Sequence, residues 1–116
     1  DRGRYKVDAT AELCGRIHAA MDVQPIPDRF RRSMEAHDAL FCCVDTIDIR
    51  RLIWESVKDR VLFFCDGRMA AEAVRILTAA DGPGRSHYPT TLFPAAEAHR
   101  GACTAKSTSR PGSSAR

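Results

Sequence analysis

The sequence lacks the features that would mark a membrane protein or a nucleic-acid-binding protein. Its longest uninterrupted apolar run, residues 39–44, has six residues, whereas a membrane-spanning helix needs about 20. No dense block of Lys and Arg interleaved with aromatic residues occurs, and the formal net charge is only +3, so nucleic-acid binding is not favoured. No segment has the pattern of a signal peptide. We therefore expect a soluble, cytoplasmic protein with neither a membrane nor a nucleic acid as partner.

Motifs for binding metal ions and phosphate groups are also missing. The five cysteines form no C-x-x-C pair, and the four histidines share no metal-ligand spacing. Cys42, Cys43 and Cys65 lie within apolar runs, where Cys behaves as a small hydrophobe. Reduced thiols and the absence of a zinc site are therefore predicted. The chain also contains neither a G-x-G-x-x-G motif nor a P-loop, so it carries no recognisable phosphate-binding loop.

The residues that are present have the composition of an ordinary globular domain, with 44% apolar and 28% charged residues. A length of 116 residues allows one domain with a modest core. Hydrophobic periodicity predicts an alternation of helices and strands. The expected elements are a helix (4–21), a short edge strand (23–26), an irregular helix (28–37), a buried strand (39–44), a helix (46–58), a second buried strand (60–65), a turn (81–84) and a helical turn (90–93). This order is typical of an α/β fold.

The junction at Asp45 is the most informative point of the chain. The buried strand 39–44 ends there and the helix 46–58 begins immediately afterwards. In open α/β sheets ligands bind outside the carboxyl ends of the strands, so Asp45 is a candidate ligand for Mg²⁺. The alternative is a capping role, in which Asp45 or Thr46 accepts hydrogen bonds from the first N–H groups of the helix.

Several segments resemble the ThiF/MoeB/HesA family, the bacterial relatives of ubiquitin-activating enzymes. The segment CVDTIDIRR is similar to the family's C-T-D-N-x-x-x-R segment, and GRYKV at residues 3–7 is similar to its G-x-x-K helix start. FFCDGRM at residues 63–69 follows in the same order, and HYPTTLF with CTAKST resembles the family's crossover region. The resemblance covers most of residues 3–108. It implies an incomplete Rossmann-like sheet with flanking helices, and a strand within residues 69–80, whose composition alone leaves helix and strand open.

The resemblance also implies a set of site residues for ATP-dependent adenylation of a carrier protein. Asp45 would bind Mg²⁺ and act in catalysis, Lys6 would contact the ATP phosphates, and Thr46 stands where the family has Asn. Arg50 matches a family Arg that faces the site or supports the strand–helix turn, although a surface or salt-bridging Arg is the alternative. In relatives a crossover-loop Cys forms a thioester, which makes Cys103 a candidate nucleophile beside the alternative of an ordinary loop thiol.

Two neighbouring residues have less specific roles. Asp66 and Arg68 come at the end of the second buried strand, 60–65. If the two buried strands are neighbours, Asp66 opens onto the same edge as Asp45 and the two carboxylates could share a cation. A turn formed by Asp66-Gly67 is the other interpretation.

The implied whole enzyme activates the C-terminal carboxylate of a ubiquitin-like or sulfur-carrier protein with ATP and Mg²⁺, as a homodimer. Residues 1–108 would be a partial adenylation domain, since the family's phosphate loop is missing, and the Ser/Gly/Pro-rich residues 109–116 are expected to be disordered. This chain alone is then not expected to be active. The alternatives are a non-catalytic Rossmann-like nucleotide-binding or scaffold module, and half of an NAD(P)- or FAD-binding oxidoreductase.

Overall fold

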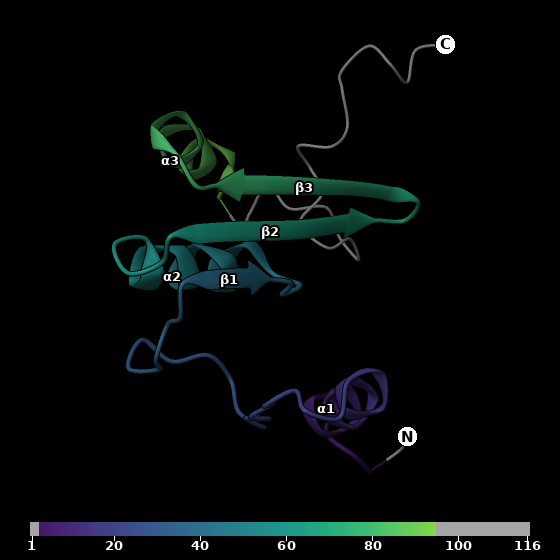
Figure 1. Cartoon of the computed structure of the whole chain (residues 1–116). Coiled ribbons are helices and arrows are strands. Elements are labelled where there is room, and N and C mark those ends of the chain that lie inside the picture. Colours follow the sequence, from purple (N-terminus) through teal and green to yellow (C-terminus); the bar gives the residue numbers. More distant parts are fainter. Residues whose placement is uncertain (1–2, 95–116) are drawn as a thin grey trace. The chain divides into compact units, whose positions relative to one another are not determined.

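The computed structural model describes residues 3–94 of the chain (Figure 1). By their internal contacts the described residues form two compact units, divided between Phe30 and Arg31. The first unit contains one helix, and the second contains a three-stranded sheet with its helices. A mixed α/β fold is therefore confirmed at the level of its architecture.

In the first unit, helix α1 spans Lys6–Ile17 and is shorter than the predicted 4–21. Arg4 forms an exposed ion pair with Glu12 at 2.9 Å. None of the residues in α1 is buried. The expected strand at 23–26 is wrong, because residues 22–30 form neither helix nor strand. Pro25 and Pro27 each remove a backbone N–H, which leaves this segment without the donors that a strand ladder needs.

The second unit is built on a mixed sheet with the strand order β1-β2-β3. Strand β1 (Ala39–Cys42) is parallel to β2 (Phe63–Ala70), which pairs antiparallel with β3 (Ala73–Ala79). Helix α2 (Ile47–Val57) is the crossover between the two parallel strands, as such a connection requires. Residues 31–38 before β1 are turns and irregular chain, so the helix predicted at 28–37 is wrong.

Helix α2 begins at the predicted position because Thr46 caps it. The Thr46 hydroxyl oxygen accepts a hydrogen bond from the backbone N–H of Ile49 at 3.4 Å. The buried face of α2 carries Trp54, whose ring packs edge-on against Phe64 and Tyr88 at centroid distances of 5.0 and 4.8 Å. These rings form the centre of the core, together with Ile47, Ile53, Val57 and Val61.

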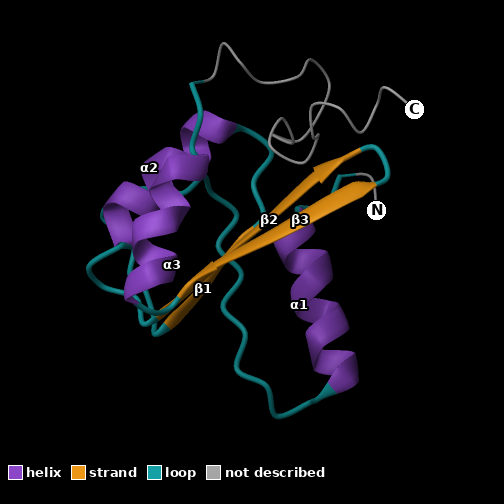
Figure 2. Ribbon diagram, turned by 90° about the horizontal axis from the view of Figure 1, so that it is seen from above, coloured by secondary structure: helices purple, strands orange, loops and turns teal. Residues whose placement is uncertain are grey.

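Helix α3 (Gly82–His87) replaces the turn predicted at 81–84. The Asp81 side chain accepts a hydrogen bond from Gly84 N–H at 2.8 Å, and a proline stands in the first turn, so the segment starts a short helix. The 3₁₀ helix η1 follows at Tyr88–Thr91, close to the expected helical turn. Seen from above, α2 and α3 lie on the same side of the sheet (Figure 2).

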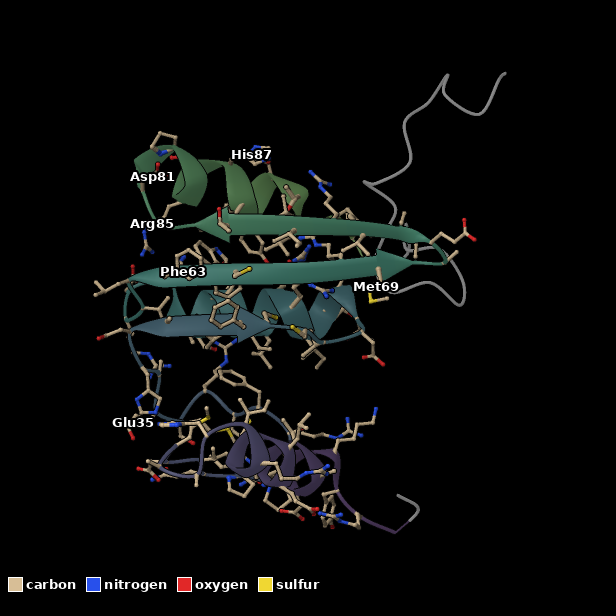
Figure 3. All side chains as sticks on the ribbon, turned by 45° about the vertical axis from the view of Figure 1, so that its right-hand side comes forward. Glu35, Phe63, Met69, Asp81, Arg85 and His87 are labelled. Atoms are coloured by element: carbon tan, nitrogen blue, oxygen red, sulfur yellow. The ribbon has the colours of Figure 1, made fainter. Side chains whose placement is uncertain are left out.

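Strand β2 continues through residues that were expected to end it. Asp66 and Gly67 are paired with Leu77 and Ile76 of β3, so the predicted Asp-Gly turn is wrong and the strand runs on to Ala70 (Figure 3, where Phe63 is its first residue and Met69 its last but one). The strand expected within 69–80 is confirmed as β3. The antiparallel partner explains the difference, because it supplies hydrogen bonds to residues that favour a turn in isolation.

The two faces of the sheet differ in exposure. Side chains on the helix-covered face, such as Phe64, Asp66 and Arg68, are buried. The opposite face carries Phe41, Val74 and Ile76, which are 61–68% exposed. Coverage of both faces, which the buried-strand pattern predicted, is therefore not seen for these residues. Within residues 3–94, no helix combines the length and apolar character that crossing a membrane requires.

The β2–β3 hairpin turns through only two residues, Ala71 and Glu72, between the paired Ala70 and Ala73. Ala71 has a φ of 51°, in the left-handed region that two-residue hairpin turns use and that favours glycine. We predict that Ala71→Gly raises the free energy of unfolding by about 0.5–1 kcal/mol, measured by urea denaturation. Ala73→Gly, in the strand itself, is the matched control and should lower it by a similar amount. Equal destabilisation by both would contradict the turn argument.

Candidate functional site

Asp45 lies in the loop between β1 and α2, at the carboxyl end of a parallel strand. Its side chain is exposed, and within residues 3–94 its carboxylate has no hydrogen bond or ion pair. Thr46 performs the capping that was the alternative role for Asp45. The carboxylate is therefore available to a ligand at the edge where open α/β sheets bind them.

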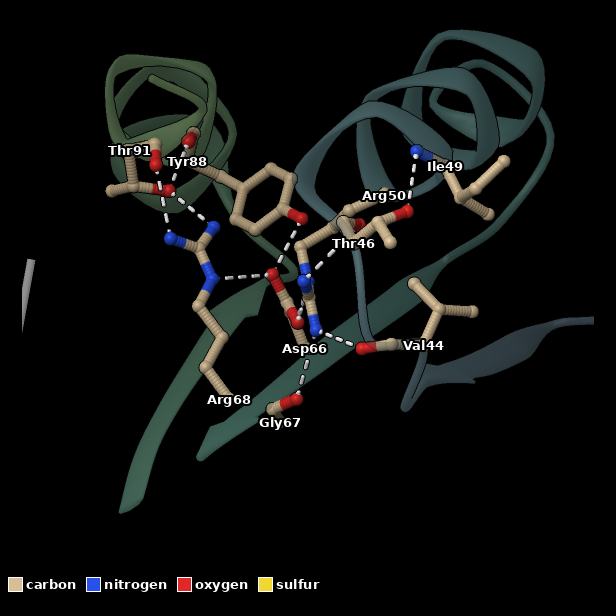
Figure 4. Close-up of polar contacts among 9 residues, drawn as sticks. All are labelled: Val44, Thr46, Ile49, Arg50, Asp66, Gly67, Arg68, Tyr88 and Thr91. Atoms are coloured by element: carbon tan, nitrogen blue, oxygen red, sulfur yellow. Dashed lines mark hydrogen bonds and ion pairs between the residues drawn. The ribbon is translucent and has the colours of Figure 1, made fainter. Parts of the chain in front are cut away.

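Arg50 is completely buried one turn into α2 and holds the Asp45 loop in place. Its Nη2 donates to the carbonyl oxygen of Val44 at 2.5 Å and its Nη1 to that of Thr46 at 3.4 Å, the residues on either side of Asp45 (Figure 4). Of the two roles left open, the geometry matches support of the strand–helix turn. Direct binding of a nucleotide by Arg50 stays a prediction and would require this buried side chain to move.

Asp66 is the buried carboxylate on which the polar cluster converges. One of its oxygens accepts from Nε of Arg50 at 2.6 Å, and the other accepts from Nε of Arg68 at 2.9 Å and from the Tyr88 hydroxyl at 2.7 Å (Figure 4). All three side chains and Asp66 are at most 1% exposed. Asp66 is fully buried and both of its oxygens are engaged by two guanidinium groups and a hydroxyl, which speaks against a cation shared with the exposed Asp45 carboxylate.

The same cluster fixes helix η1 against the sheet. Arg68 donates from Nη1 to the Thr91 carbonyl at 2.9 Å and from Nη2 to the Thr91 hydroxyl at 2.8 Å. Its guanidinium carbon lies 5.8 Å from the centroid of the Tyr88 ring. Because a buried charge is tolerated only when it is paired and hydrogen-bonded, these contacts specify where residues 88–91 must pack.

Tyr88 and Thr91 were not identified from the sequence. The available signal was the order Phe64, Asp66, Arg68 within an apolar strand, which places an acid and a base on the buried face with period two. Nothing in the sequence indicated that a tyrosine 22 residues later would donate to Asp66. Burial and this hydrogen bond both raise the pKa of Tyr88, which keeps the hydroxyl protonated as a donor.

Lys6 lies in the first unit, as the first residue of α1. A hollow of about 480 Å³ is lined by residues of both ends of that unit, and two of them, Lys6 and Arg29, are cationic. Asp28 contributes the one acidic group of the lining: Tyr5, Lys6, Val7, Ile26, Pro27, Asp28 and Arg29. The setting suits an anion, since the α1 N-terminus and two cations face it.

The remaining predictions concern Cys103, the tail and a metal site. Cys103, and the tail 109–116, are beyond residue 94. Within residues 3–94 no group of three or more His, Cys, Asp or Glu residues is arranged to hold a metal ion. A Mg²⁺ ion held by a single carboxylate, phosphate oxygens and water needs no such group, and Asp45 fits this donor set.

Comparisons of the chain with protein-family models, with curated proteins and with solved structures found no match. The functional assignment therefore depends on the ordered motifs and on the geometry of the β1–α2 junction.

Removing the charge of Asp66 tests the central role of this cluster. Asp66→Asn leaves Arg50 and Arg68 buried without their counter-charge, so we expect a loss of about 3–5 kcal/mol in the free energy of unfolding. Asp59→Asn, on an exposed carboxylate after α2, should change it by less than about 0.5 kcal/mol. Urea denaturation of both variants makes the comparison, and a loss below about 1 kcal/mol in Asp66→Asn would refute the role.

Alkaline pH provides a second test. Burial, assisted by the Asp66 carboxylate, raises the pKa of the Cys42 thiol from its ordinary 9.0 to about 11. A raised pKa means that the folded chain holds this proton more tightly than the unfolded chain, so its contribution to stability is complete below about pH 9 and is lost as the pH rises towards 11. Tyr88, also raised, acts in the same direction.

We therefore expect the free energy of unfolding to fall between pH 9 and 11, with about 1–3 kcal/mol of the fall due to Cys42. Cys42→Ala should make the slope shallower, whereas Cys43→Ala, on an exposed neighbour, should leave it unchanged. Urea denaturation at pH 8, 9, 10 and 11 gives the slopes. Identical slopes for the wild type and Cys42→Ala would contradict this assignment.

Proposed function

We propose that the chain is part of a ThiF-like adenylyltransferase that activates the C-terminal carboxylate of a ubiquitin-like or sulfur-carrier protein with ATP. The observation that carries the proposal is the exposed Asp45 carboxylate, which has no partner within residues 3–94 and stands between a parallel strand and a capped helix. Capping by Thr46 and support by Arg50 leave Asp45 itself available. This is the arrangement expected of a ligand-binding acid at the edge of an α/β sheet.

Each proposed residue has a distinct task. Asp45 would hold Mg²⁺, which neutralises negative charge on the phosphates when it is bound. Lys6, with the N-terminus of α1, would hold phosphate oxygens. Thr46 fixes the first turn of α2 and would stand beside the nucleotide. Arg50 keeps the carbonyl groups on both sides of Asp45 in position, so we assign it chiefly a positioning role.

The proposed reaction forms an acyl-adenylate. A carboxylate oxygen of the carrier attacks the α-phosphorus of ATP, the bond to the β-phosphate oxygen breaks, and pyrophosphate leaves. Catalysis of this step is mainly positional and electrostatic. Cys103 would then attack the acyl carbon as a thiolate and release AMP, which leaves the carrier as a thioester. In the complete enzyme we propose a homodimer acting in the cytoplasm.

A non-catalytic module that binds a nucleotide or a partner protein is the second candidate. Two observations favour it. No phosphate-binding glycine loop occurs in the sequence, and Arg50, the matching family arginine, is completely buried in a structural cluster. Half of an NAD(P)- or FAD-binding oxidoreductase is the third candidate, and it would require a dinucleotide fingerprint outside these 116 residues.

Titration calorimetry with ATP and Mg²⁺ distinguishes these candidates. For the adenylation proposal we expect binding that strengthens when Mg²⁺ is present, and at least about a tenfold loss of that strengthening in Asp45→Asn, because a neutral amide is a much poorer Mg²⁺ ligand. Asp48→Asn removes an equally exposed charge from the first turn of the same helix and should change the affinity by less than about twofold. Lys6→Ala should weaken binding with or without Mg²⁺.

The complete enzyme provides the test of activity. Asp45→Ala is expected to abolish carrier-dependent ATP–pyrophosphate exchange while circular dichroism and thermal unfolding remain those of the wild type. Unchanged exchange would exclude the assigned role of Asp45. Binding of ATP that is absent or millimolar, together with absent exchange, would favour the scaffold module.

A further inference from the structure

The covered face of the sheet carries more positive than negative charge. Arg68 of β2 stands directly opposite Arg75 of β3 in the antiparallel register, so both side chains leave the sheet on the same face. Arg50 of α2 contacts the same face through its ion pair with Asp66. Arg50 and Arg68 are both bound to Asp66, and the Arg75 guanidinium lies on the same face within the electrostatic influence of Asp66 and Arg68.

Asp66 cannot compensate all three cations. Its two oxygens are engaged by Arg50, Arg68 and Tyr88 at 2.6–2.9 Å, and within residues 3–94 no ion pair joins Arg75 to any carboxylate. Arg68 donates from both of its terminal nitrogens to Thr91. The positive charge of Arg75 is therefore the one in this cluster that the described protein leaves uncompensated.

Arg75 also has the one unsatisfied donor. Within the described part of the chain, its Nη1 is the single buried side-chain nitrogen or oxygen without a hydrogen-bond partner. Burial and the neighbouring Arg68 charge lower the pKa of this guanidinium, which is the effect of a cation that is short of counter-charge. A buried donor without an acceptor is unfavourable, so Nη1 is a position where an acceptor is missing.

We propose that Arg75, with the positive field of Arg68, binds a phosphate group, either inorganic phosphate or the phosphate of a small metabolite. A guanidinium group matches the geometry of an oxyanion and can donate two parallel hydrogen bonds to it. The two neighbouring cations, Arg75 and Arg68, favour phosphate, with about −1.5 to −2 charges at pH 7, over a singly charged carboxylate. Nη1 itself is buried, so binding requires the half-buried Arg75 side chain to turn its guanidinium towards solvent.

This site goes beyond the proposed function, since it uses none of Lys6, Asp45, Thr46 or Cys103. It lies instead at the β2–β3 hairpin, where Arg75 stands opposite Arg68, the ion-pair partner of Asp66. Whether phosphate binds at Arg75 therefore does not bear on ATP binding at the β1–α2 junction.

Thermal unfolding in sodium phosphate, sodium acetate and sodium chloride at matched ionic strength and pH 7.0 is the test. We expect phosphate to raise the Tm saturably, by about 5 °C at ten times its Kd, and acetate to raise it by less than half as much. Arg75→Gln should abolish the phosphate increment whatever its effect on the baseline Tm. Arg16→Gln, which removes an exposed positive charge from α1, should retain the full increment.

Two outcomes would overturn the proposal. An equal increment in acetate would assign the position to a carboxylate instead, and a phosphate increment that survives in Arg75→Gln would show nonspecific salt stabilisation. If Arg75→Gln does not fold, the wild type still decides. Its arginine Nε–Hε NMR signals should show Arg75 and Arg68 shifting saturably with phosphate while Arg16 does not, and an unshifted Arg75 signal would refute the site.

Discussion

The second unit depends on one buried carboxylate, that of Asp66. It joins three segments that are far apart in the sequence, because Arg50 comes from α2, Arg68 from β2 itself and Tyr88 from η1. A charge at 0% exposure is stable only while every partner stays in place. The packing of α2 and η1 on the sheet is therefore specified by hydrogen-bond geometry as well as by the Trp54, Phe64 and Tyr88 rings.

Arginine side chains also hold the backbone of the loops in place. Arg50 holds the Val44 and Thr46 carbonyl groups, and Arg85 of α3 (labelled in Figure 3) donates to the carbonyl groups of Lys58 and Val61 at 2.7 Å each. Backbone carbonyl groups at strand and helix ends lack partners within their own elements, and the forked guanidinium satisfies two at once. Asp45 is exposed on a loop whose backbone is held by Arg50. A binding residue needs such preorganisation.

The two faces of the sheet differ in the side chains that they carry. The helix-covered face holds the charged cluster, whereas Phe41, Val74 and Ile76 on the other face are 61–68% exposed. In larger α/β folds helices cover both faces of such a sheet. Phe41, Val74 and Ile76 therefore mark the face that such a covering layer would occupy.

The sequence by itself determined the local elements wherever one short segment contained the whole cause. The apolar run before Asp45, the Thr46 cap and the periodicity of residues 46–58 fixed β1, α2 and the exposed acid between them, because hydrophobic patterning and capping act over a few residues. Where local preference and distant partners disagree, the local pattern failed. Asp66-Gly67 favours a turn, yet β3 supplies its hydrogen bonds and two arginines supply its counter-charge.

Only the tertiary structure decided that Arg50 is buried, that Tyr88 donates to Asp66 and that Arg75 has an unpaired donor. These facts arise when residues from separate segments meet in a medium of low polarity, where each charge must find its partner. The sequence contains these charged residues, but only the folded structure determines which of them are in contact.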